Sequence, residues 1–541
     1  MIVQQQNLAE KRRQAVQIEI DGRRSDAERN RLGQFATPNA LAIEMAMHMA
    51  KLIGRAKDGL RFADPSIGSG SFFSAALTVF GRKGIESAVG VELDPAFCMA
   101  ARNLWATAGL DVIQGDFTKI IANGSRLPSP NLILANPPYV RHHHLSREDK
   151  QRLQALVHKM TGIEVNGLAG LYVYFLLLAT SWMEDGGYAA WLIPSEFMDV
   201  NYGLAIKDFL TSRVTLTRIH RFDPDDVQFG DALVSSAIVI LQKKMPPVGY
   251  SVEFSFGGTL DHPQASDSIS LHQLRESRKW TVYPSHAKND RHTLSAGNGP
   301  TLADLFRIQR GIATGGNKFF VLSRADADRR ELPKKYLRPI LPSPRHLKAT
   351  VIERDEDGYP SLEQQLCVID CDLPEQIVES RYPALWKYLE TARILGIRDG
   401  YLVGKRSPWY KQEQRESAPF LCTYMGRGSN EKQPFRFIWN QSDAIGTNLY
   451  LMLYPRSALA TMLRRIPGCA SELFALLGQV TGNELRGEGR VYGGGLHKIE
   501  PSELGRISAI PIVARWPELV PCIVRHNTAS LFGQFSEERQ L

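Results

Sequence analysis

The sequence of 541 residues has few cysteines and no long apolar run. Its six cysteines lack the paired Cys-x-x-Cys spacing of a zinc ribbon or redox site, which favours reduced intracellular thiols. Residues 1–31 are polar and lack the apolar core of a signal peptide. The longest apolar stretch, residues 168–183, is short for a membrane span and is followed by a Gly-rich turn. We therefore expect a cytoplasmic protein with no membrane partner.

Neither sign of charge is in large excess, and no tract has low complexity. The chain has 65 basic and 57 acidic residues, a formal net charge of +8. This balance suits a polyanionic partner, and it equally suits an ordinary protein with a pI near 9.0. The length predicts two to four domains, each able to bury its own core.

Strand and helix signals alternate through the first 245 residues. The segment 5–32 predicts one or two polar helices, and Thr37-Pro38 provides an N-cap hydroxyl and a first-turn proline for a helix over 41–52. Strands are predicted at 61–64, 88–92, 112–114, 132–135, 188–193, 216–221 and 235–241. Helices are predicted at 70–80, 95–107 and 168–183, and a further helix ends with residues 206–210. This alternation indicates an α/β domain with a mostly parallel, doubly wound sheet.

The alternation stops near residue 245. Residues 246–300 are irregular in pattern, and from 301 the chain is richer in aromatic residues, Arg, Gly and Pro. The sequence therefore predicts a first domain over 1–245 that includes the N-terminal helices 1–32. A connector over 246–300 and a second module over 301–541 follow it.

A Gly-rich turn, 64–71, lies between the first predicted strand and its helix. Gly68 and Gly70 would allow the backbone to approach a ligand closely. The turn lacks the third glycine of the dinucleotide fingerprint and the Gly-Lys-Ser/Thr of a P-loop. It opens with Asp64, which suits a cationic amino-acid group better than a phosphate.

Acidic residues follow the next two predicted strands. Glu92 stands where a carboxylate accepts hydrogen bonds from ribose hydroxyls. Asp116 could accept from an adenine amino group, and Phe117 could pack on the ring. Taken singly, a Gly-rich turn is often only a turn, and such a carboxylate is often only a helix cap. The order of these segments on successive strand ends supports a nucleotide-like ligand.

The fourth strand end carries Asn136-Pro137-Pro138-Tyr139, directly after the apolar run 132–135. Ligand sites of open α/β sheets lie at the carboxyl ends of strands. The turn would place an amide and an aromatic ring together there. Such a pair is suited to hold a planar nitrogen nucleophile during methyl transfer.

In this order the segments resemble the S-adenosylmethionine-dependent methyltransferases. They resemble most the gamma class of adenine-N6 DNA methyltransferases of type II restriction–modification systems. The matching segments are 34–38, 64–70, 91–95, 115–117, 136–139, 186–188 and 201–203. Weaker matches at 309–320 and 490–501 resemble the two ends of a target-recognition region. The resemblance implies a Rossmann-like class I methyltransferase domain with a mostly parallel seven-stranded sheet, one strand reversed, and a C-terminal α+β target-recognition domain.

The resemblance also implies the residues of the site. S-adenosyl-L-methionine would be bound by Thr37, Pro38, Asp64, Pro65, Gly68, Gly70, Glu92, Asp116, Phe117 and Pro138. The catalytic residues would be Asn136, Pro137, Tyr139 and Tyr202. Two points depart from the usual pattern. Ile67 is an extra residue in the Gly-rich turn, which leaves the contact at Ser66 open, and the second aromatic over the base could be Phe197 instead of Tyr202.

The chemistry of the target explains the catalytic turn. An exocyclic adenine amine is a poor nucleophile because its lone pair is delocalised into the ring. Asn136 Oδ1 and the Pro137 carbonyl could accept its two hydrogens and favour a pyramidal nitrogen. No general base is needed, since the product proton can leave after transfer. Extruding the adenine from a duplex costs about a few kcal/mol, and stacking on Tyr139 and Tyr202, at ~1–3 kcal/mol per base, would offset part of this.

Other charged groups are less specific. Adjacent histidines such as 142–144 rarely form one metal site, because consecutive side chains point in different directions. We expect a solvated or phosphate-facing loop there and no metal site. Basic residues of the second module could contact phosphates or guanine edges; they are Arg307, Arg310, Lys318, Lys405, Arg406, Arg427, Lys432, Arg436, Arg486 and Arg490, interleaved with Trp409, Tyr410, Tyr424 and Phe437.

Alternatives remain. The Asn136 turn also occurs in methyltransferases that act on ribosomal RNA guanine or on protein glutamine. A non-catalytic DNA-binding subunit could keep the same fold. The sequence has no convincing Asp…Glu-x-Lys nuclease constellation, so a cognate restriction endonuclease would be a separate chain. We expect a monomer that acts on double-stranded DNA.

Overall fold

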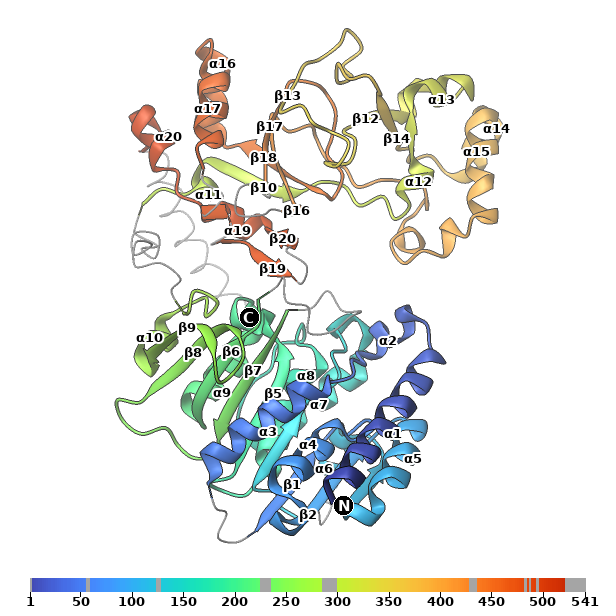
Figure 1. Ribbon diagram of the computed structural model, residues 1–541. Helices are drawn as coiled ribbons and strands as arrows, with labels where there is room; N and C mark the ends of the chain where they lie inside the picture. Colours follow the sequence, from blue (N-terminus) through green and yellow to red (C-terminus); the bar gives the residue numbers. More distant parts are fainter. Residues whose placement is uncertain are drawn as a thin grey trace. The chain divides into compact units, whose positions relative to one another are not determined.

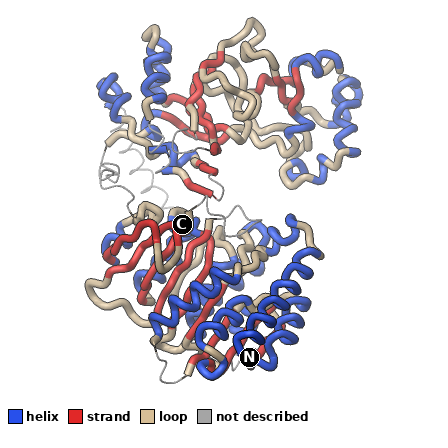
Figure 2. The backbone as a smooth tube through the Cα atoms, in the orientation of Figure 1, coloured by secondary structure: helices blue, strands red, loops and turns tan. Residues whose placement is uncertain are grey.

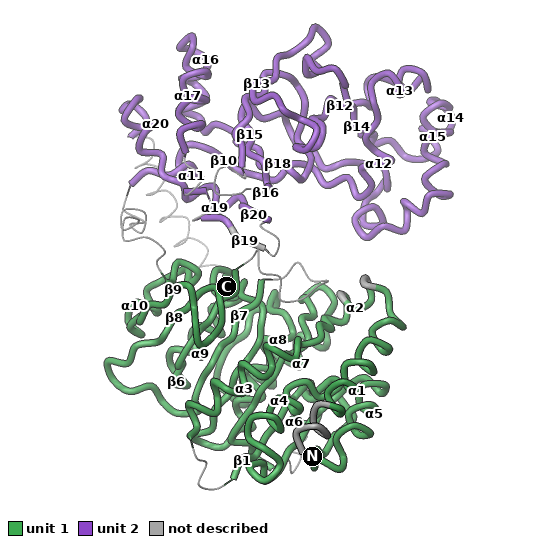
Figure 3. The backbone as a smooth tube through the Cα atoms, in the orientation of Figure 1, with its two compact units in different colours: residues 1–291, 492–494 green, residues 292–491, 495–541 purple. Residues whose placement is uncertain are grey.

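The computed structural model describes residues 2–54, 59–122, 128–223, 235–284, 299–427, 435–480, 484–485, 488–492 and 496–520. The chain divides into two compact units (Figure 3). Unit 1 comprises residues 1–291 with 492–494, and unit 2 comprises residues 292–491 with 495–541. Within the described ranges, no helix has the length and apolar character needed to cross a membrane.

Unit 1 is built around a nine-stranded sheet in the order β3-β2-β1-β4-β5-β7-β6-β8-β9 (Figure 1). The strands are β1 (Leu60–Asp64), β2 (Ile85–Glu92), β3 (Leu110–Gln114), β4 (Leu132–Ala135), β5 (Tyr188–Pro194), β6 (Thr215–Arg221), β7 (Ser236–Gln242), β8 (Ser251–Gly258) and β9 (Pro263–Ser270). The neighbours from β3 to β5 pair in parallel, and β7 is antiparallel to both β5 and β6. The first seven positions thus confirm the predicted seven-stranded sheet with one reversed strand.

Helices bury both faces of this sheet (Figure 2). The helices of unit 1 are α1 (Ile2–Gly22), α2 (Asp26–Leu32), α3 (Asn39–Ile53), α4 (Ser71–Phe80), α5 (Pro95–Trp105), α6 (Phe117–Ala122), α7 (Arg147–Thr161), α8 (Leu171–Trp182), α9 (Leu204–Ser212) and α10 (Leu271–Glu276). Successive strand residues face opposite layers. Phe62 and Leu132 pack with α3, α4 and α5, whereas Ala63 and Ile133 pack with α7, α8 and α9. Burial on both faces explains why the central strands are nearly continuous apolar runs.

The boundary that the sequence predicted near 245 was wrong. Instead of an irregular connector, β8 pairs in parallel with β6, β9 pairs antiparallel with β8, and α10 follows. The apolar pattern failed because β9 is an edge strand whose residues are mostly exposed or half-buried, with Gln, Ser and Asp in place of apolar residues. The first unit therefore continues to residue 291.

Unit 2 is an α+β assembly, as predicted. Its strands form a sheet in the order β10-β18-β15-β17-β13 and two three-stranded sheets, β11-β14-β12 and β16-β20-β19. The strands are β10 (Phe306–Arg310), β11 (Val321–Ser323), β12 (Leu337–Ile340), β13 (Val351–Ile352), β14 (Leu366–Ile369), β15 (Phe420–Thr423), β16 (Met425–Arg427), β17 (Phe437–Asn440), β18 (Tyr450–Pro455), β19 (Arg490–Tyr492) and β20 (Leu496–Lys498). The helices are α11 (Leu302–Leu305), α12 (Asn317–Phe320), α13 (Arg324–Arg329), α14 (Glu375–Arg381), α15 (Pro383–Ile394), α16 (Ser457–Arg465), α17 (Cys469–Gly478), α19 (Pro501–Gly505) and α20 (Ile510–Arg515). Two apolar clusters form its core.

Candidate active site

The predicted site segments all follow parallel strands of unit 1. β1 ends at Asp64, β2 at Glu92, β3 at Gln114 and β4 at Ala135. These four strands are adjacent and run in the same direction. The Gly-rich turn, Glu92, Asp116 and the Asn136 turn therefore lie along one edge of the sheet, where open α/β sheets bind ligands.

The Gly-rich turn has an open side and a closed side. Gly68 has φ +53°, and a Cβ added there would meet no atom within 4 Å. Gly70 has φ +90°, and a Cβ there would lie 2.4 Å from the Trp105 indole nitrogen. Gly68 N–H donates to Glu92 Oε2 (2.8 Å). The turn thus packs tightly against the protein at Gly70 and leaves space at Gly68 that a ligand could fill.

Two carboxylates beside this turn have raised pKa values. Asp64 is buried and accepts from Ser66 N–H (2.9 Å), and burial, together with the Glu92 charge, raises its pKa to about 8. Glu92 accepts from Gly68 N–H and from Asp94 N–H (2.8 Å each). Burial raises its pKa, although both backbone bonds act in the other direction. The site therefore holds two carboxylates that a positive charge would stabilise in their ionised form.

Asp116 is held by its own turn. Its Oδ1 accepts from Thr118 N–H (2.9 Å) and Thr118 Oγ1–H (2.7 Å), so it caps α6, as carboxylates after strands often do. Its Oδ2 lies 3.8 Å from Arg152 Nη2. Phe117 is 1% exposed and packs against Phe175 and Trp182, with ring centroids 5.3 and 5.8 Å apart. This packing does not support the interpretation of Phe117 as a ring that lies over adenine.

The amide of Asn136 is oriented by the N-terminal segment. Its Nδ2 donates to the Phe35 carbonyl (2.9 Å) and to Thr37 Oγ1 (3.1 Å). Both amide hydrogens are therefore engaged, which fixes the amide plane. Asn136 is half-buried. This arrangement leaves Oδ1 as the acceptor that the side chain offers to a substrate.

The backbone of the catalytic turn is held by the same segment and by the Gly-rich turn. Tyr139 N–H donates to the Gly33 carbonyl (3.0 Å). Gly33 has φ +64°, and a Cβ there would lie 2.4 Å from Tyr139 N. Ser66 Oγ–H donates to the Asn136 carbonyl (3.1 Å). Ser66 thus links the Gly-rich turn to the catalytic turn.

The start of α3 differs from the prediction. Pro38, not Thr37, occupies the N-cap position of α3, and no side chain caps this helix. The Thr37 hydroxyl accepts from Asn136 instead, and the Thr37 carbonyl accepts from Ser71 Oγ–H (2.9 Å). Thr37 is buried and Pro38 is exposed. The N-cap interpretation was wrong because a tertiary partner competes for the hydroxyl, and this places Thr37 directly at the catalytic amide.

Aromatic side chains surround the turn. Tyr139 is 7% exposed, donates to the Leu192 carbonyl (3.1 Å) and has its ring centroid 5.5 Å from that of Phe35. Tyr202 is half-buried and donates to Glu196. Burial raises the pKa of Tyr172 well above its usual value. The neighbouring Glu196, Tyr202 and Tyr139 also affect this pKa. These residues thus form one cluster.

Phe197, the second choice for the aromatic over the base, lies in the core. It is 0% exposed and makes an edge contact with Trp280 at 6.5 Å between ring centroids. A Cβ on Gly203 would lie 1.9 Å from the Phe197 carbonyl oxygen, so this turn is also tightly packed. The burial of Phe197 leaves Tyr202 as the favoured residue.

The remaining predicted residues lie beside these. Pro65 and Pro137 are buried, and Pro138 is half-buried. Sequence reasoning missed Gly33 and Phe35. Gly33 immediately precedes the matching segment 34–38, and a glycine there was the available signal. Phe35 acts through its backbone carbonyl, which no side-chain motif reveals.

The histidines at 142–144 and the predicted basic residues of unit 2 differ in their surroundings. His143 and His144 are exposed, and no cluster of His, Cys, Asp or Glu in the described chain could hold a metal ion. Arg406 donates to the Ala313 and Thr314 carbonyls, and Arg436 donates to three backbone carbonyls, so both stabilise loops. Of the predicted basic residues, four are exposed: Arg307, Arg310, Lys318 and Lys405.

Two of these exposed arginines lie over aromatic rings. Arg307 lies over Tyr454 (4.4 Å) and Arg310 over Tyr424 (4.1 Å). The interleaved Trp409, Tyr410, Tyr424 and Phe437 are buried and pack in the core of unit 2. Lys432 and Arg486 lie outside the described residues, as do the side chains of Arg427 and Arg490.

Two families match the chain. Residues 131–228 match the Eco57I restriction-modification methylase, and residues 277–528 match the C-terminal domain of the type II methyltransferase M.Eco57I. The type II methyltransferase M.XamI of Xanthomonas campestris pv. amaranthicola is 29% identical over 460 residues, 83% of this chain and 80% of the relative. M.AccI of Acinetobacter calcoaceticus is 23% identical over 390 residues, 69% of this chain and 68% of the relative.

A solved structure shares the fold. The type IIL restriction-modification enzyme MmeI, solved in complex with DNA, aligns with a TM-score of 0.50 and 12% identity, over 83% of this chain and 63% of that one. The sheet order and the site on its carboxyl edge define a class I methyltransferase fold. Taken together, the matches show that the chain is similar to the methyltransferases of type II restriction–modification systems.

Proposed function

We propose that this protein is a site-specific DNA adenine-N6 methyltransferase of the gamma class. Its methyl donor is S-adenosyl-L-methionine and its substrate is an adenine extruded from double-stranded DNA. The observation that carries the proposal is the fixed amide of Asn136. Because Phe35 and Thr37 engage its Nδ2, Oδ1 is available to an incoming amine.

The two acceptors of the turn explain how an amine becomes a nucleophile. Asn136 Oδ1 and the Pro137 carbonyl would each accept one hydrogen of the adenine N6 amine. Proline at 137 and 138 removes two backbone N–H donors that would compete for these acceptors. The amine then directs its lone pair away from the ring, and the proton leaves after transfer. Orientation of two bound reactants provides most of the acceleration.

The Gly68 edge fits a sulfonium nucleoside. Gly68 would border the ligand, because a Cβ there would point into open space. The raised pKa of Asp64 favours a bound cation, and Asp64 would meet the ammonium group. Glu92 would accept from the ribose hydroxyls, and Asp116 would accept from the adenine amino group through its second oxygen. The bound cofactor supplies an electrophilic methyl group on sulfur.

Base extrusion would be completed by the aromatic cluster. Tyr139 is held at its hydroxyl by Leu192, so its ring position is fixed. Tyr202 is anchored by Glu196 and would cover the other face of the base. Stacking on each ring is worth ~1–3 kcal/mol.

The names of the relatives support DNA as the substrate, since they are type II methyltransferases and the MmeI structure contains DNA. In this proposal unit 1 catalyses transfer and unit 2 recognises the target sequence. Arg307 and Arg310 suit such a role because they are exposed and held over aromatic rings. We also propose that the protein works as a monomer in the cytoplasm, beside a cognate endonuclease on a separate chain.

Transfer of a labelled methyl group tests the proposal. The protein is incubated with labelled S-adenosylmethionine and either duplex DNA, RNA or protein extract. We expect label in duplex DNA at defined sites. Label in RNA or in a glutamine side chain alone would support the alternatives, and no label with intact DNA binding would indicate a non-catalytic subunit.

Asn136→Ala is the matched variant for this experiment. It should reduce the rate of transfer by about 10³-fold, a loss similar to that of a removed oxyanion donor. Its affinity for S-adenosylmethionine, measured by calorimetry, should stay within about threefold of wild type. Loss of cofactor binding would mean that the role of Asn136 is misassigned.

A further inference from the structure

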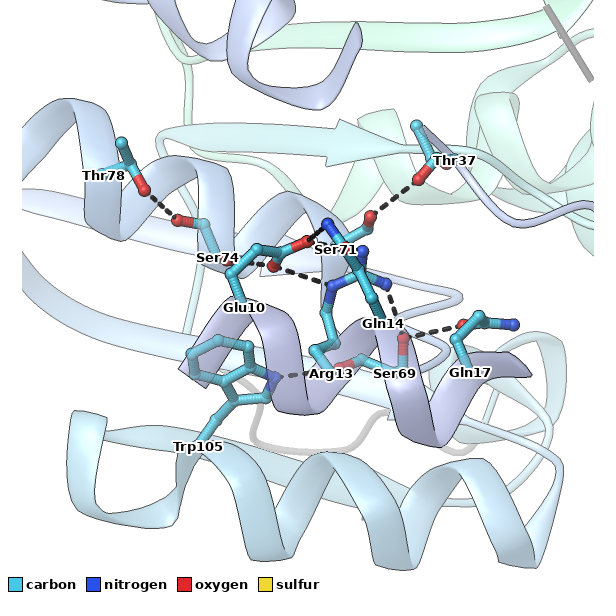
Figure 4. Close-up of polar contacts among 10 residues, drawn as sticks. All are labelled: Glu10, Arg13, Gln14, Gln17, Thr37, Ser69, Ser71, Ser74, Thr78 and Trp105. Atoms are coloured by element: carbon cyan, nitrogen blue, oxygen red, sulfur yellow. Dashed lines mark hydrogen bonds and ion pairs between the residues drawn. The ribbon is translucent and has the colours of Figure 1, made fainter. Parts of the chain in front are cut away.

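The first helix reaches the cofactor edge through polar contacts. Among the side chains of α1 that the structure describes (residues 8–22), Arg13 and Ile20 are buried. Arg13 is 3% exposed, and arginine is seldom buried unless it is paired. Figure 4 shows α1 beside the start of α4, with Arg13 directed at the Gly-rich turn.

Arg13 has partners on both sides. Its Nε and Nη2 donate to the two carboxylate oxygens of Glu10 (2.9 and 2.7 Å). Its Nη1 donates to Ser69 Oγ (2.9 Å). The bidentate ion pair fixes the guanidinium plane. Burial acts to raise the pKa of Glu10, but its hydrogen bonds with Arg13 and Ser74 outweigh this and lower it, so Glu10 stays ionised.

Ser69 is held from several directions. Its hydroxyl accepts from Arg13 and donates to Gln17 Oε1 (2.7 Å), and its carbonyl accepts from Trp105 Nε1–H (2.9 Å). Ser74, one turn into α4, donates to Glu10 Oε2 (2.6 Å). Three residues of α1 thus contact the Gly-rich turn and the first turn of α4 (Figure 4).

The position of Ser69 gives these contacts their importance. It lies between Gly68 (φ +53°) and Gly70 (φ +90°), both in conformations that favour glycine. Glycines have the largest backbone freedom, so a free Gly-Ser-Gly segment would sample many shapes. Fixing the hydroxyl and the carbonyl of Ser69 selects one shape before a ligand arrives. Pre-organisation of this kind raises affinity because less ordering occurs on binding.

We propose that α1 is a bracket that holds the turn 68–70 in its cofactor-binding shape, and that Arg13 is a positioning residue for S-adenosylmethionine. This inference rests on the proposed function, because it assigns the ligand of the same turn. In this proposal Arg13 makes no contact of its own with the cofactor or the base. It acts through Ser69, whose hydroxyl faces α1 while Gly68 borders the open space.

Calorimetric titration of the full-length protein with S-adenosylmethionine tests the bracket. Arg13→Ala should raise Kd about tenfold, the effect of one lost charged hydrogen bond. Ser69→Ala should raise it similarly, and the double variant should bind no more weakly than Arg13→Ala, because both changes break one linkage. Arg12→Ala, an exposed neighbour on the same helix, should bind like wild type.

Steady-state kinetics separates positioning from general damage. The KM for S-adenosylmethionine should rise about tenfold in Arg13→Ala, while kcat at saturating cofactor and the KM for DNA stay within about twofold. Should Arg13→Ala fail to fold, Ser69→Ala retains the Arg13–Glu10 pair and gives the same test. Unchanged cofactor affinity in either variant would overturn the bracket. Absence of binding by wild type would overturn the proposed function and the bracket together.

Discussion

The two turns at opposite ends of the site edge are stabilised in different ways. The turn at Asp116 is capped mainly by its own residues, since its carboxylate accepts from Thr118 two residues later, and Arg152 is its nearest distant partner. The turn at Asn136 depends on residues about a hundred positions away, with its amide bonded to Phe35 and Thr37 and its backbone to Gly33. The Gly-rich turn is of the second kind, because α1 holds it.

In the proposed function, this difference separates cofactor binding from catalysis. A cap that a turn makes for itself positions one carboxylate, and a modest shift there would change only one contact of the cofactor. The catalytic amide needs a defined plane, and a local turn cannot supply both of its acceptors. The N-terminal segment is therefore the external support of the Asn136 turn, which carries the reacting groups in the proposed function.

Replacing Gly33 should have the largest effect on the turn at Asn136. Gly33→Ala would place a Cβ 2.4 Å from Tyr139 N and displace the catalytic turn. We expect transfer to fall at least about 100-fold, the effect of a shift near 1 Å. Gly54→Ala is the matched control, because Gly54 has the same φ of +64° with nothing within 4 Å. Equal activity of the two variants in the methylation assay would contradict the external support.

Replacing Asp64 tests the charge at the cofactor edge. Asp64→Asn should weaken S-adenosylmethionine binding about 10–100-fold, because a charged hydrogen bond to the ammonium is lost. Calorimetry at pH 7.5 measures this loss. Ser66 N–H keeps its acceptor in the variant, so the turn should stay folded. Wild-type affinity in Asp64→Asn would mean that Asp64 does not meet the cation.

The same variant should change the pH dependence of stability. The pKa of Asp64 is 3.8 ordinarily and about 8 in the folded protein. The folded state therefore holds this proton more tightly, and the free energy of unfolding falls as pH rises from about 4 to about 8. Asp64→Asn should unfold with a free energy about 1–3 kcal/mol higher than wild type at pH 8. An equal difference in the free energy of unfolding between Asp64→Asn and wild type at pH 5 and at pH 8 would contradict a raised pKa of Asp64.

Thr37→Val tests one of the two hydrogen bonds that hold the Asn136 amide, and its effect should be smaller than that of Gly33→Ala. The valine fills the same volume but removes the hydroxyl that accepts from Asn136. The amide keeps its bond to Phe35, so we expect kcat to fall about tenfold with the Kd for S-adenosylmethionine unchanged. Rapid-quench measurement of the transfer step checks this. A rise in Kd at constant kcat would assign Thr37 to the cofactor alone.

The smallest effect is expected at the self-contained turn. Asp116→Asn retains an oxygen that can cap α6, so the fold should be unaffected. The Kd for S-adenosylmethionine should rise about threefold, since one charge-assisted bond becomes a neutral one. Fluorescence titration is sensitive enough to detect it. A loss as large as that of Asp64→Asn would show that the turn at Asp116 is as critical for cofactor binding as the turn at Asp64.

Much of the fold could be predicted from sequence because its signals are local. The run 132–135 is wholly apolar, and the turns after residues 64 and 135 contain Gly or Pro. The edge strand β9 could not be predicted, because strands exposed at a sheet edge need no apolar alternation. Its polar residues resemble a loop until pairing with β8 is known.

The site was predictable to the same extent. Asp64 and Glu92 are the last residues of β1 and β2, and Asn136 directly follows β4, so their placement follows from topology. The role of Phe117 stays a prediction, because an aromatic after a strand can pack inward, as Phe117 does against Phe175 and Trp182, as easily as over a ligand. The roles of Arg13, Gly33 and Phe35 depend on contacts between distant segments. The spacing of residues in the sequence does not reveal those contacts.

The identity of the methylated base tests the central claim most directly. Duplex DNA labelled by the protein and S-adenosylmethionine is digested to nucleosides and analysed by mass spectrometry. The account predicts that the label is recovered as N6-methyl-2′-deoxyadenosine and that Asn136→Ala nearly abolishes it while still binding the cofactor. Label recovered on the exocyclic amine of cytosine, or full activity of Asn136→Ala, would contradict it.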